Sequence, residues 1–230
     1  MPLVDLDLNV GELKCEPSNL YSLATVVSVA CGGHVGDPAS MARAVSFAMA
    51  RGARIAAHPS YPDREAITGD ALAASIEQQC AALQAIARKL GFSVALVKPH
   101  GALLDQATID PEVARAFLDG ATRGLGNTKN LTVVGPPQGP LREETLRRGF
   151  RYAREAFADR TYTAEAKLVP ASSPSARITD RAAAVRQAVA LASSGTIEML
   201  CVHSDTPEAI LIAGDVREAL LQNGYLAGNL

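Results

Sequence analysis

The sequence predicts an α/β protein built on a parallel sheet, and two observations carry this prediction. Seven short β-rich runs alternate with longer amphipathic segments along the chain. This alternation is typical of parallel strands joined by helices. The runs read LVDLDLNV, SVAC, ARIAAH, SVALVKPH, LTVVG, FRYAREAF and EMLCVH. Such a sheet either closes as a barrel or stays open and doubly wound.

The first run favours a barrel because its residues alternate between apolar and polar. Parallel strands covered by helices on both faces usually read as continuous apolar runs. Three polar side chains sharing one strand face would be costly to bury in an apolar core, so they predict a polar barrel lumen or a binding site. An edge strand with a solvated face is the alternative. The apolar face holds Val4, Leu6, Leu8 and Val10, and the polar face holds Asp5, Asp7 and Asn9.

Helix boundaries follow from capping signals. An acidic or hydroxyl residue followed by proline marks predicted helix starts at residues 37–38, 110–111 and 206–207, where proline fits the first helical position. Gly52 closes the first of these helices. Residues 70–90 have apolar side chains at helical spacing and end before a glycine. Residues 167–175, KLVPASSPS, read as a loop or flap.

Length and composition predict one domain over residues 1–230 and a small-molecule ligand. The chain shows no seam between domains, and its net charge of -2 comes without a basic stripe or acidic tail. This argues against nucleic acid or an anionic membrane as partner. No apolar stretch reaches the roughly 18 residues of a spanning helix, and the N-terminus does not resemble a signal peptide. We therefore expect a cytoplasmic protein.

The cysteines form no C-x-x-C pair, so the sequence indicates neither a zinc knuckle nor a disulfide framework. We predict buried, reduced thiols, and Cys31 retains a claim to reactivity because it lies among polar residues. The four positions are Cys15, Cys31, Cys80 and Cys201.

All four histidines lie at or just beyond the C-terminal end of a predicted strand. In parallel α/β folds the loops at that rim build active sites. Any one histidine has a satisfied core position as its alternative, but four from four different strands predict a shared site. They are His34, His58, His100 and His203.

Lys98 and His100 are the strongest catalytic candidates of this rim. Lys98 lies on an apolar strand, where an ammonium requires a partner. It could stabilise an oxyanion, form an ion pair with Asp7 or Glu155, or do both. His100 is a candidate acid/base because imidazole titrates near neutral pH. Asp7 or Glu12 is expected to share proton transfer with His100, and Glu155 completes the predicted catalytic residues.

Other polar residues beside the histidines are candidates for substrate binding. Two of them have a competing structural role, because Asp37 is placed to cap a helix and Asp205 could also cap one. The binding candidates are Asn9, His34, Asp37, His58, Asp159, His203 and Asp205.

Five segments of the chain resemble motifs of the LamB/YcsF family, the class that supplies the A subunits of 5-oxoprolinases. VSVACGGHVGDP resembles A-C-G-F-H-A-G-D-P, AAHPSYPD resembles A-H-P-G-Y-P-D, and VKPHGALL resembles V-K-P-H-G-A-L-Y. REAFADRTY resembles R-E-x-F-A-D-R-x-Y, and CVHSDTP resembles C-V-H-G-D-T-P. The fourth motif adds Arg160 to the binding candidates. The matches run in order from the first strand to about Pro207.

This resemblance implies a seven-stranded β/α barrel of the glycoside hydrolase/deacetylase type. It also implies the opening of the lactam 5-oxoproline to glutamate with ATP consumed, in company with separate subunits B and C. The chain contains no G-x-x-x-x-G-K-[ST] segment, so ATP is expected to be used through the partner subunits.

The chain departs from the family pattern at four places. The family's D-L-N-A-D-L-G-E reads DLDLNVGE, which puts Asp7 in place of an amide and Asn9 in place of a carboxylate. Gly33 replaces a phenylalanine, and Ser60 replaces a glycine. The expected G-F-G-R-R stretch after HPSYPD reads AITGD, without either arginine.

Two other functions stay open at this level. Rim histidines beside carboxylates also suit a metal-dependent deacetylase or amidohydrolase, and the sequence leaves metal content undetermined. The departures from the family pattern suit a diverged binding paralogue without catalysis.

Overall fold

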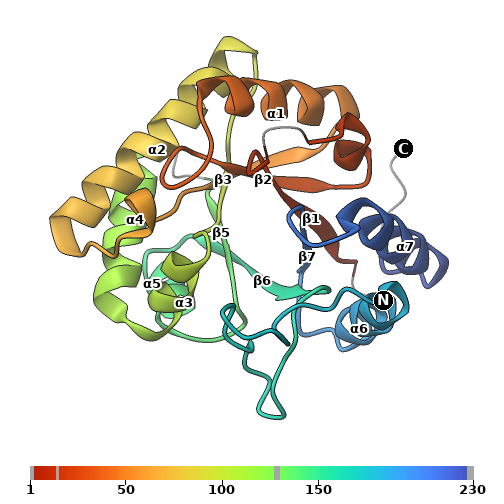
Figure 1. The fold of residues 1–230 in the computed structure, drawn as a ribbon. Helices are drawn as coiled ribbons and strands as arrows, with labels where there is room; N and C mark the ends of the chain where they lie inside the picture. Colours follow the sequence, from red (N-terminus) through yellow and green to blue (C-terminus); the bar gives the residue numbers. More distant parts are fainter. Residues whose placement is uncertain (1–2, 14–15, 127–129, 227–230) are drawn as a thin grey trace.

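The computed structural model describes residues 3–13, 16–126 and 130–226. Its seven strands are parallel and form a closed barrel in chain order, because β1 pairs with both β2 and β7 (Figure 1). The predicted runs all contain strands, and the closed alternative is confirmed over the open sheet. The strands are β1 (Asp5–Val10), β2 (Val26–Ala30), β3 (Arg54–His58), β4 (Leu96–Val97), β5 (Thr132–Gly135), β6 (Arg151–Phe157) and β7 (Met199–His203).

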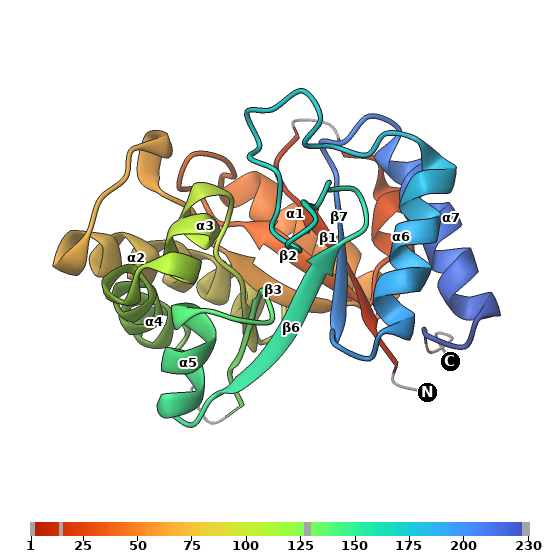
Figure 2. The same cartoon turned by 90° about the horizontal axis from the view of Figure 1, so that it is seen from below.

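Helices surround the barrel on its outer face, as the view down the strands shows (Figure 1) and the side view confirms (Figure 2). They are α1 (Pro38–Arg51), α2 (Gly69–Lys89), α3 (Ala102–Ile109), α4 (Pro111–Leu125), α5 (Pro140–Arg147), α6 (Arg181–Ser193) and α7 (Ala209–Gln222). Short 3₁₀ helices, η1 (Ser18–Ser22) and η2 (Pro62–Arg64), lie in the loops that follow β1 and β3. Among the described residues, no helix is long and apolar enough to cross a bilayer.

The caps explain where two of the helices begin. The Asp37 side chain accepts from the backbone N–H of Ser40 in a capping box, and Gly52 ends α1 in the left-handed conformation. Asp110 caps α4 in the same manner through the N–H of Glu112. The predicted helices at residues 37–52 and 70–90 and the helix start at 110–111 are therefore confirmed.

The predicted start of the last helix at residues 206–207 is wrong. Helix α7 begins at Ala209, and its N-cap Glu208 makes no side-chain capping bond. The Thr206 hydroxyl donates to Asp159 at 2.6 Å. The Asp205 carboxylate pairs with Arg177. These contacts hold both side chains to other partners.

Helices α2 and α4 make a close crossing at two glycines. A Cβ at Gly120 would lie 2.3 Å from the carbonyl oxygen of Ala73, and one at Gly124 would lie 2.5 Å from that of Glu77. Only glycine lets the two backbones approach so closely. This contact holds the outer wall of the barrel around β3 and β4.

The alternation in β1 separates two environments, as predicted. Leu6, Leu8 and Val10 are fully buried in the large core between the strands and the helices, whereas Asp7 and Asn9 are buried inside the barrel. Asp5 lies at the opposite end of the strand, where it pairs with Arg54.

The barrel interior is layered. A separate apolar cluster takes one buried side chain from each of five strands and closes the lower part of the lumen: Val26, Ala56, Leu96, Val134 and Met199. Because side chains of a strand alternate in direction, residues two positions further along each strand form the next layer towards the carboxyl ends. That layer is polar, and the functional candidates begin there.

The segment after β6 folds back on itself. Isolated antiparallel bridges join Arg160 to Arg177 and Tyr162 to Leu168, and the segment extends beyond the end of β6 (Figure 1). Residues 167–175 contain neither helix nor regular strand, so the predicted loop is confirmed.

Candidate functional site

A buried ammonium organises the polar layer of the barrel. Lys98 Nζ donates to Asp7 Oδ2 at 2.8 Å, to Asn9 Oδ1 at 3.0 Å and to Glu155 Oε1 at 2.8 Å. The Cys201 sulfur lies 3.2 Å from the same nitrogen. These groups come from β1, β6, β7 and the end of β4, so the ammonium ties four strands together.

The charged groups of this layer shift one another's pKa values. Burial alone would lower the pKa of Lys98, but Asp7, Cys201 and Glu155 together raise it well above its usual range. Burial, reinforced by Asp7, raises the pKa of Glu155 to about 7. An ammonium has three N–H donors, and three oxygens occupy them here. The geometry therefore supports the structural ion pair for Lys98, and in this arrangement no N–H is left for an oxyanion.

Three of the four histidines meet above this layer. The rings of His58 and His100 stack with centroids 4.2 Å apart, and the ring of His34 lies 4.7 Å from that of His100. His203 lies against Phe157, with ring centroids 5.3 Å apart. The structure thus brings these three histidines together at the C-terminal rim, as predicted. His203 lies at the end of β7, which pairs with β1 and β6.

Glu12 and His100 form a close pair at the barrel mouth. His100 Nε2 lies 3.3 Å from Glu12 Oε1, and both side chains are largely buried. Burial, with Asp205 and Glu16 nearby, raises the pKa of Glu12 to about 7. Burial and the neighbouring His34 lower the pKa of His100 to about 3. Of the two groups in this pair, Glu12 is therefore the one with a pKa near neutral pH, whereas the lowered pKa favours a neutral His100 imidazole.

His58 has a nitrogen lone pair close to Glu12 and His100. Its Nδ1 lies 2.9 Å from the carbonyl oxygen of Lys98, and a carbonyl oxygen only accepts, so Nδ1 carries the hydrogen. The opposite nitrogen, Nε2, is buried without a partner among the described residues. Burial and His100 lower the pKa of His58 well below its usual range, which keeps this ring neutral.

Glu16 holds the loop that carries Glu12, and the sequence analysis did not identify it. Its carboxylate accepts from the backbone N–H groups of Gly11 and Glu12 at 2.8 and 3.0 Å and from the Tyr21 hydroxyl at 2.9 Å. A carboxylate that collects several backbone donors fixes a tight turn. The glycine before Glu12 and an acid four residues later were the available signals.

His203 belongs to a second arrangement on the same rim. Asp159 is fully buried, lies 3.0 Å from His203 Nδ1, and accepts from the backbone N–H of His203 at 2.9 Å. Although burial opposes the charge, Asp159 raises the pKa of His203. The pair therefore offers a cationic or strongly polarised imidazole suited to an anionic group of a ligand.

His34 is held by a chain of polar residues that the sequence did not indicate. Ser60 Oγ accepts from the backbone N–H of His34 at 3.0 Å and lies 2.8 Å from its Nδ1. Gln79 in turn binds both the N–H and the carbonyl oxygen of Ser60. This chain anchors the loop after β2 to the loop after β3.

Three predicted binding residues are engaged in structural contacts of their own. Asp37 caps α1, and Asp205 pairs with Arg177 at an exposed position. Arg160 donates to the carbonyl oxygens of Ala176 and Val169 and so closes the folded-back segment. Their assignment as substrate-binding residues stays a prediction.

The described cysteines are buried and free. Burial raises the pKa of the Cys31 thiol to about 12, and its sulfur accepts from the N–H of His58. This opposes a nucleophilic role, because the thiolate is the reactive form. Cys201 has a larger part than predicted, since it contacts Lys98. Cys15 lies outside the described residues.

The residues Glu12, His58 and His100 have ligand atoms within 4.8 Å of one another, so we tested whether they fit a metal ion. A histidine binds a metal through a lone pair in the plane of its ring, at about 2.0–2.1 Å for zinc. The stacked rings of His58 and His100 are tilted by only 20°, so their lone pairs run nearly parallel. No point close to both nitrogens lies in both planes, and the arrangement does not fit a shared ion.

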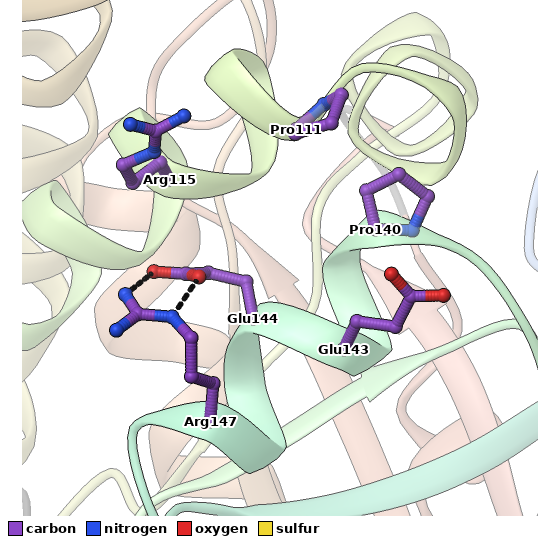
Figure 3. Close-up of a pocket in the computed structure, with 6 residues that line it drawn as sticks. All are labelled: Pro111, Arg115, Pro140, Glu143, Glu144 and Arg147. Carbon is purple, nitrogen blue, oxygen red and sulfur yellow. Dashed lines mark hydrogen bonds and ion pairs between the residues drawn. The ribbon is translucent and has the colours of Figure 1, made fainter.

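A surface groove of about 530 Å³ lies between α4 and α5 and shares no residue with the histidines (Figure 3). Glu144 and Arg147, one turn apart on α5, form an ion pair. Its charged groups largely neutralise one another, so we assign it no part in the site. It is lined by Pro111, Arg115, Pro140, Glu143, Glu144 and Arg147.

The sequence matches the LamB/YcsF family over residues 4–229. The chain belongs to the LamB/YcsF family. It is 40% identical to the A subunit of 5-oxoprolinase from Streptomyces coelicolor over 98% of this chain and 99% of that protein. It is 35% identical to the A subunit of 5-oxoprolinase from Azorhizobium caulinodans over 96% of this chain and 95% of that protein.

Solved structures agree with this family assignment. The lactam utilization protein of Thermus thermophilus superposes with a TM-score of 0.88 at 31% identity, covering 99% of this chain and 100% of that one. A family 4 carbohydrate esterase of Streptomyces lividans superposes with a TM-score of 0.53 at 14% identity, over 99% of this chain and 92% of that one. The second likeness concerns the fold alone and confirms the expected deacetylase-type barrel.

Two departures of this LamB/YcsF chain from the family pattern face each other. A Cβ built at Gly33 would lie 2.2 Å from Ser60 Oγ. The chain therefore carries glycine at position 33 and a side chain at position 60, the reverse of the family pattern. The two exchanges compensate each other in space.

Proposed function

We propose that this chain is the A component of an ATP-dependent 5-oxoprolinase, which opens the lactam of 5-oxoproline to give glutamate together with subunits B and C. The observation that carries the proposal is the Glu12 carboxyl, buried beside His100 at the barrel mouth with a pKa of about 7. The relatives named as A subunits of 5-oxoprolinase support the substrate, and the word subunit in their names supports partner proteins.

Glu12 acts as the proton carrier in this proposal. As a carboxylate it takes a proton from water, whose oxygen then attacks the lactam carbonyl carbon. The same carboxyl returns the proton to the ring nitrogen as the C–N bond breaks, which yields the amine and carboxylate of glutamate. A pKa near the working pH suits both steps. The neutral His100 ring lies beside the carboxyl.

Two further groups suit the substrate. The His203 and Asp159 pair offers positive charge for the carboxylate of 5-oxoproline, because Asp159 raises the pKa of His203. The His58 Nε2 lone pair is an acceptor that suits a lactam N–H. The absence of a G-x-x-x-x-G-K-[ST] segment from the sequence favours ATP use through the partner subunits. We expect these steps to take place in the cytoplasm.

The test is reconstitution of the chain with subunits B and C and measurement of glutamate released from 5-oxoproline with and without ATP. We expect ATP-dependent release that falls about 100-fold or more in Glu12→Gln, in line with loss of a general acid/base. Glu143→Gln is the matched control, because Glu143 is exposed in the separate groove. Absence of any release with all three subunits present would contradict the proposal.

A metal-dependent deacetylase is the second candidate, favoured by the unpartnered atoms of Glu12, His58 and His100. The stacked rings oppose it. Elemental analysis of the purified chain, with activity measured before and after chelation, separates the two candidates. A diverged binding paralogue would bind 5-oxoproline without turnover in the same assay.

A further inference from the structure

The Ser60 hydroxyl decides which nitrogen of His34 carries a hydrogen. Ser60 is buried, with 3% of its surface exposed, and its oxygen already accepts from the backbone N–H of His34. Among the described residues the only remaining acceptor for the hydroxyl hydrogen is His34 Nδ1, at 2.8 Å. A hydroxyl has one hydrogen to donate, so Nδ1 is the bare nitrogen and Nε2 carries the hydrogen.

The opposite tautomer is disfavoured by simple counting of hydrogen bonds. If Nδ1 carried the hydrogen, both lone pairs of Ser60 Oγ would be occupied and the hydroxyl hydrogen would face no acceptor. A buried donor without an acceptor costs enough free energy to favour the Nε2–H tautomer about tenfold or more. The cationic ring is disfavoured for the same reason, and burial and Arg64 also lower the pKa of His34.

Gly33 keeps the Ser60 hydroxyl in place. Besides its clash with Ser60 Oγ, a Cβ at position 33 would lie 2.8 Å from Gln79 Oε1, which accepts from the Ser60 N–H. Any side chain there would displace the hydroxyl from His34. Gly33 and Ser60 therefore act as one unit.

The hydrogen of Nε2 is available to a ligand. His34 Nε2 has no partner among the described residues and, unlike the free nitrogens of His58 and His100, is not enclosed by them. Its ring lies 4.7 Å from that of His100, which is itself paired with Glu12. The free N–H thus borders the site where the proposed chemistry takes place.

We propose that His34 is a neutral Nε2–H donor to an oxygen of the substrate, and that Ser60 is the positioning residue that fixes this tautomer. The substrate part rests on the proposed function, whereas the tautomer part stands on the geometry alone. Together they assign His34 a specificity role: the ligand must present an acceptor oxygen at this place, either the lactam carbonyl or the carboxylate.

The first test is the nitrogen NMR spectrum of the full chain, which has four histidines. His34→Gln identifies the His34 resonances by their loss. We expect near pH 7 a bare, imine-type shift for Nδ1 and a protonated, pyrrole-type shift for Nε2. In Ser60→Ala and Gly33→Ala the two nitrogens should move towards mixed tautomers. A wild-type ring protonated on Nδ1, or on both nitrogens, would overturn the proposal, whether or not the chain hydrolyses 5-oxoproline.

The second test uses a nearly isosteric pair in the reconstituted enzyme. His34→Gln can keep an N–H donor near the Nε2 position, whereas His34→Glu replaces it with an acceptor. We expect His34→Glu to raise KM for 5-oxoproline at least 10-fold more than His34→Gln, the effect of one hydrogen bond. Equal KM values would refute the donor role. Inhibition by 2-pyrrolidinone, which lacks the carboxylate, tells the two oxygens apart. If inhibition differs between His34→Gln and His34→Glu, His34 binds the lactam carbonyl. If inhibition is the same in both variants, His34 binds the carboxylate.

Discussion

The Nε2 atom of His100 lies 3.3 Å from the Oε1 atom of Glu12, and the pKa values of the two groups are shifted in opposite directions. Burial raises the pKa of the Glu12 carboxyl to about 7 and lowers the pKa of the His100 imidazole to about 3. Both shifts have one cause, because burial disfavours whichever form is charged. In the proposed reaction we therefore assign the proton-carrying role to the carboxyl, whereas the sequence alone would assign it to the histidine.

The pH profile of turnover should follow Glu12. Since the proposed first step needs the carboxylate, kcat/KM should rise with pH through a limb near pH 7. In Glu12→Gln the residual rate should lose this limb. The measurement is the rate of glutamate release between pH 5 and pH 9 in the reconstituted enzyme. A limb near pH 7 that persists in Glu12→Gln would transfer the role to another group.

Glu12 should also make the free energy of unfolding depend on pH. Its pKa is 4.5 ordinarily and about 7 when folded, so the folded state holds the proton more tightly. The stabilising contribution is fully present below pH 4.5 and is lost as pH rises through 7. Relative to wild type, Glu12→Gln should gain up to about 3 kcal/mol in free energy of unfolding between pH 4 and pH 8. Urea denaturation at both pH values measures this, and a constant difference would contradict the pKa shift.

Removal of the Lys98 ammonium should destabilise the barrel. Lys98→Met leaves Asp7 and Glu155 buried without their counter-charge, at a cost of about 3–5 kcal/mol. The loss should be smaller at pH 5, where Glu155 takes up a proton. Lys167→Met serves as the control, because Lys167 is exposed. A Lys98→Met protein as stable as wild type at pH 8 would show that the buried ion pairs are not required.

The charge of Asp159 should control His203. Asp159→Asn should lower the pKa of His203, measured by NMR titration, since the carboxylate is what raises it. The raised pKa contributes stability below pH 6.5 that is lost as pH rises through the folded value, so the variant should lose more stability at pH 6 than at pH 9. KM for 5-oxoproline should rise about 10-fold to 100-fold, as expected for one charge-assisted hydrogen bond. An unchanged KM would remove His203 from substrate binding.

Much of the fold could be predicted because it depends on local patterns. The alternation in β1 predicted that Asp7 and Asn9 face the barrel interior, and the period of two suffices for that conclusion. The cap at Asp37 was equally readable. The start of α7 was not, because Thr206 is taken by Asp159, a residue 47 positions away.

The candidate site could be predicted in its members but only partly in their roles. Lys98 was expected to stabilise an oxyanion, to form an ion pair, or to do both, and only the three-dimensional count of acceptors around its nitrogen separates these. Glu16 lies in no motif and Ser60 stood out only as a departure from one, since their importance lies in the backbone groups that they hold.

The sequence by itself determined that the histidines and carboxylates sit at strand ends, because strand periodicity and chain order place them at one rim. It also determined the family. Only the tertiary structure decided which of these groups have shifted pKa values and which histidine nitrogens lack a hydrogen-bond partner. Those properties depend on burial and on the hydrogen-bond partner across the barrel, and both arise from contacts between segments far apart in the chain.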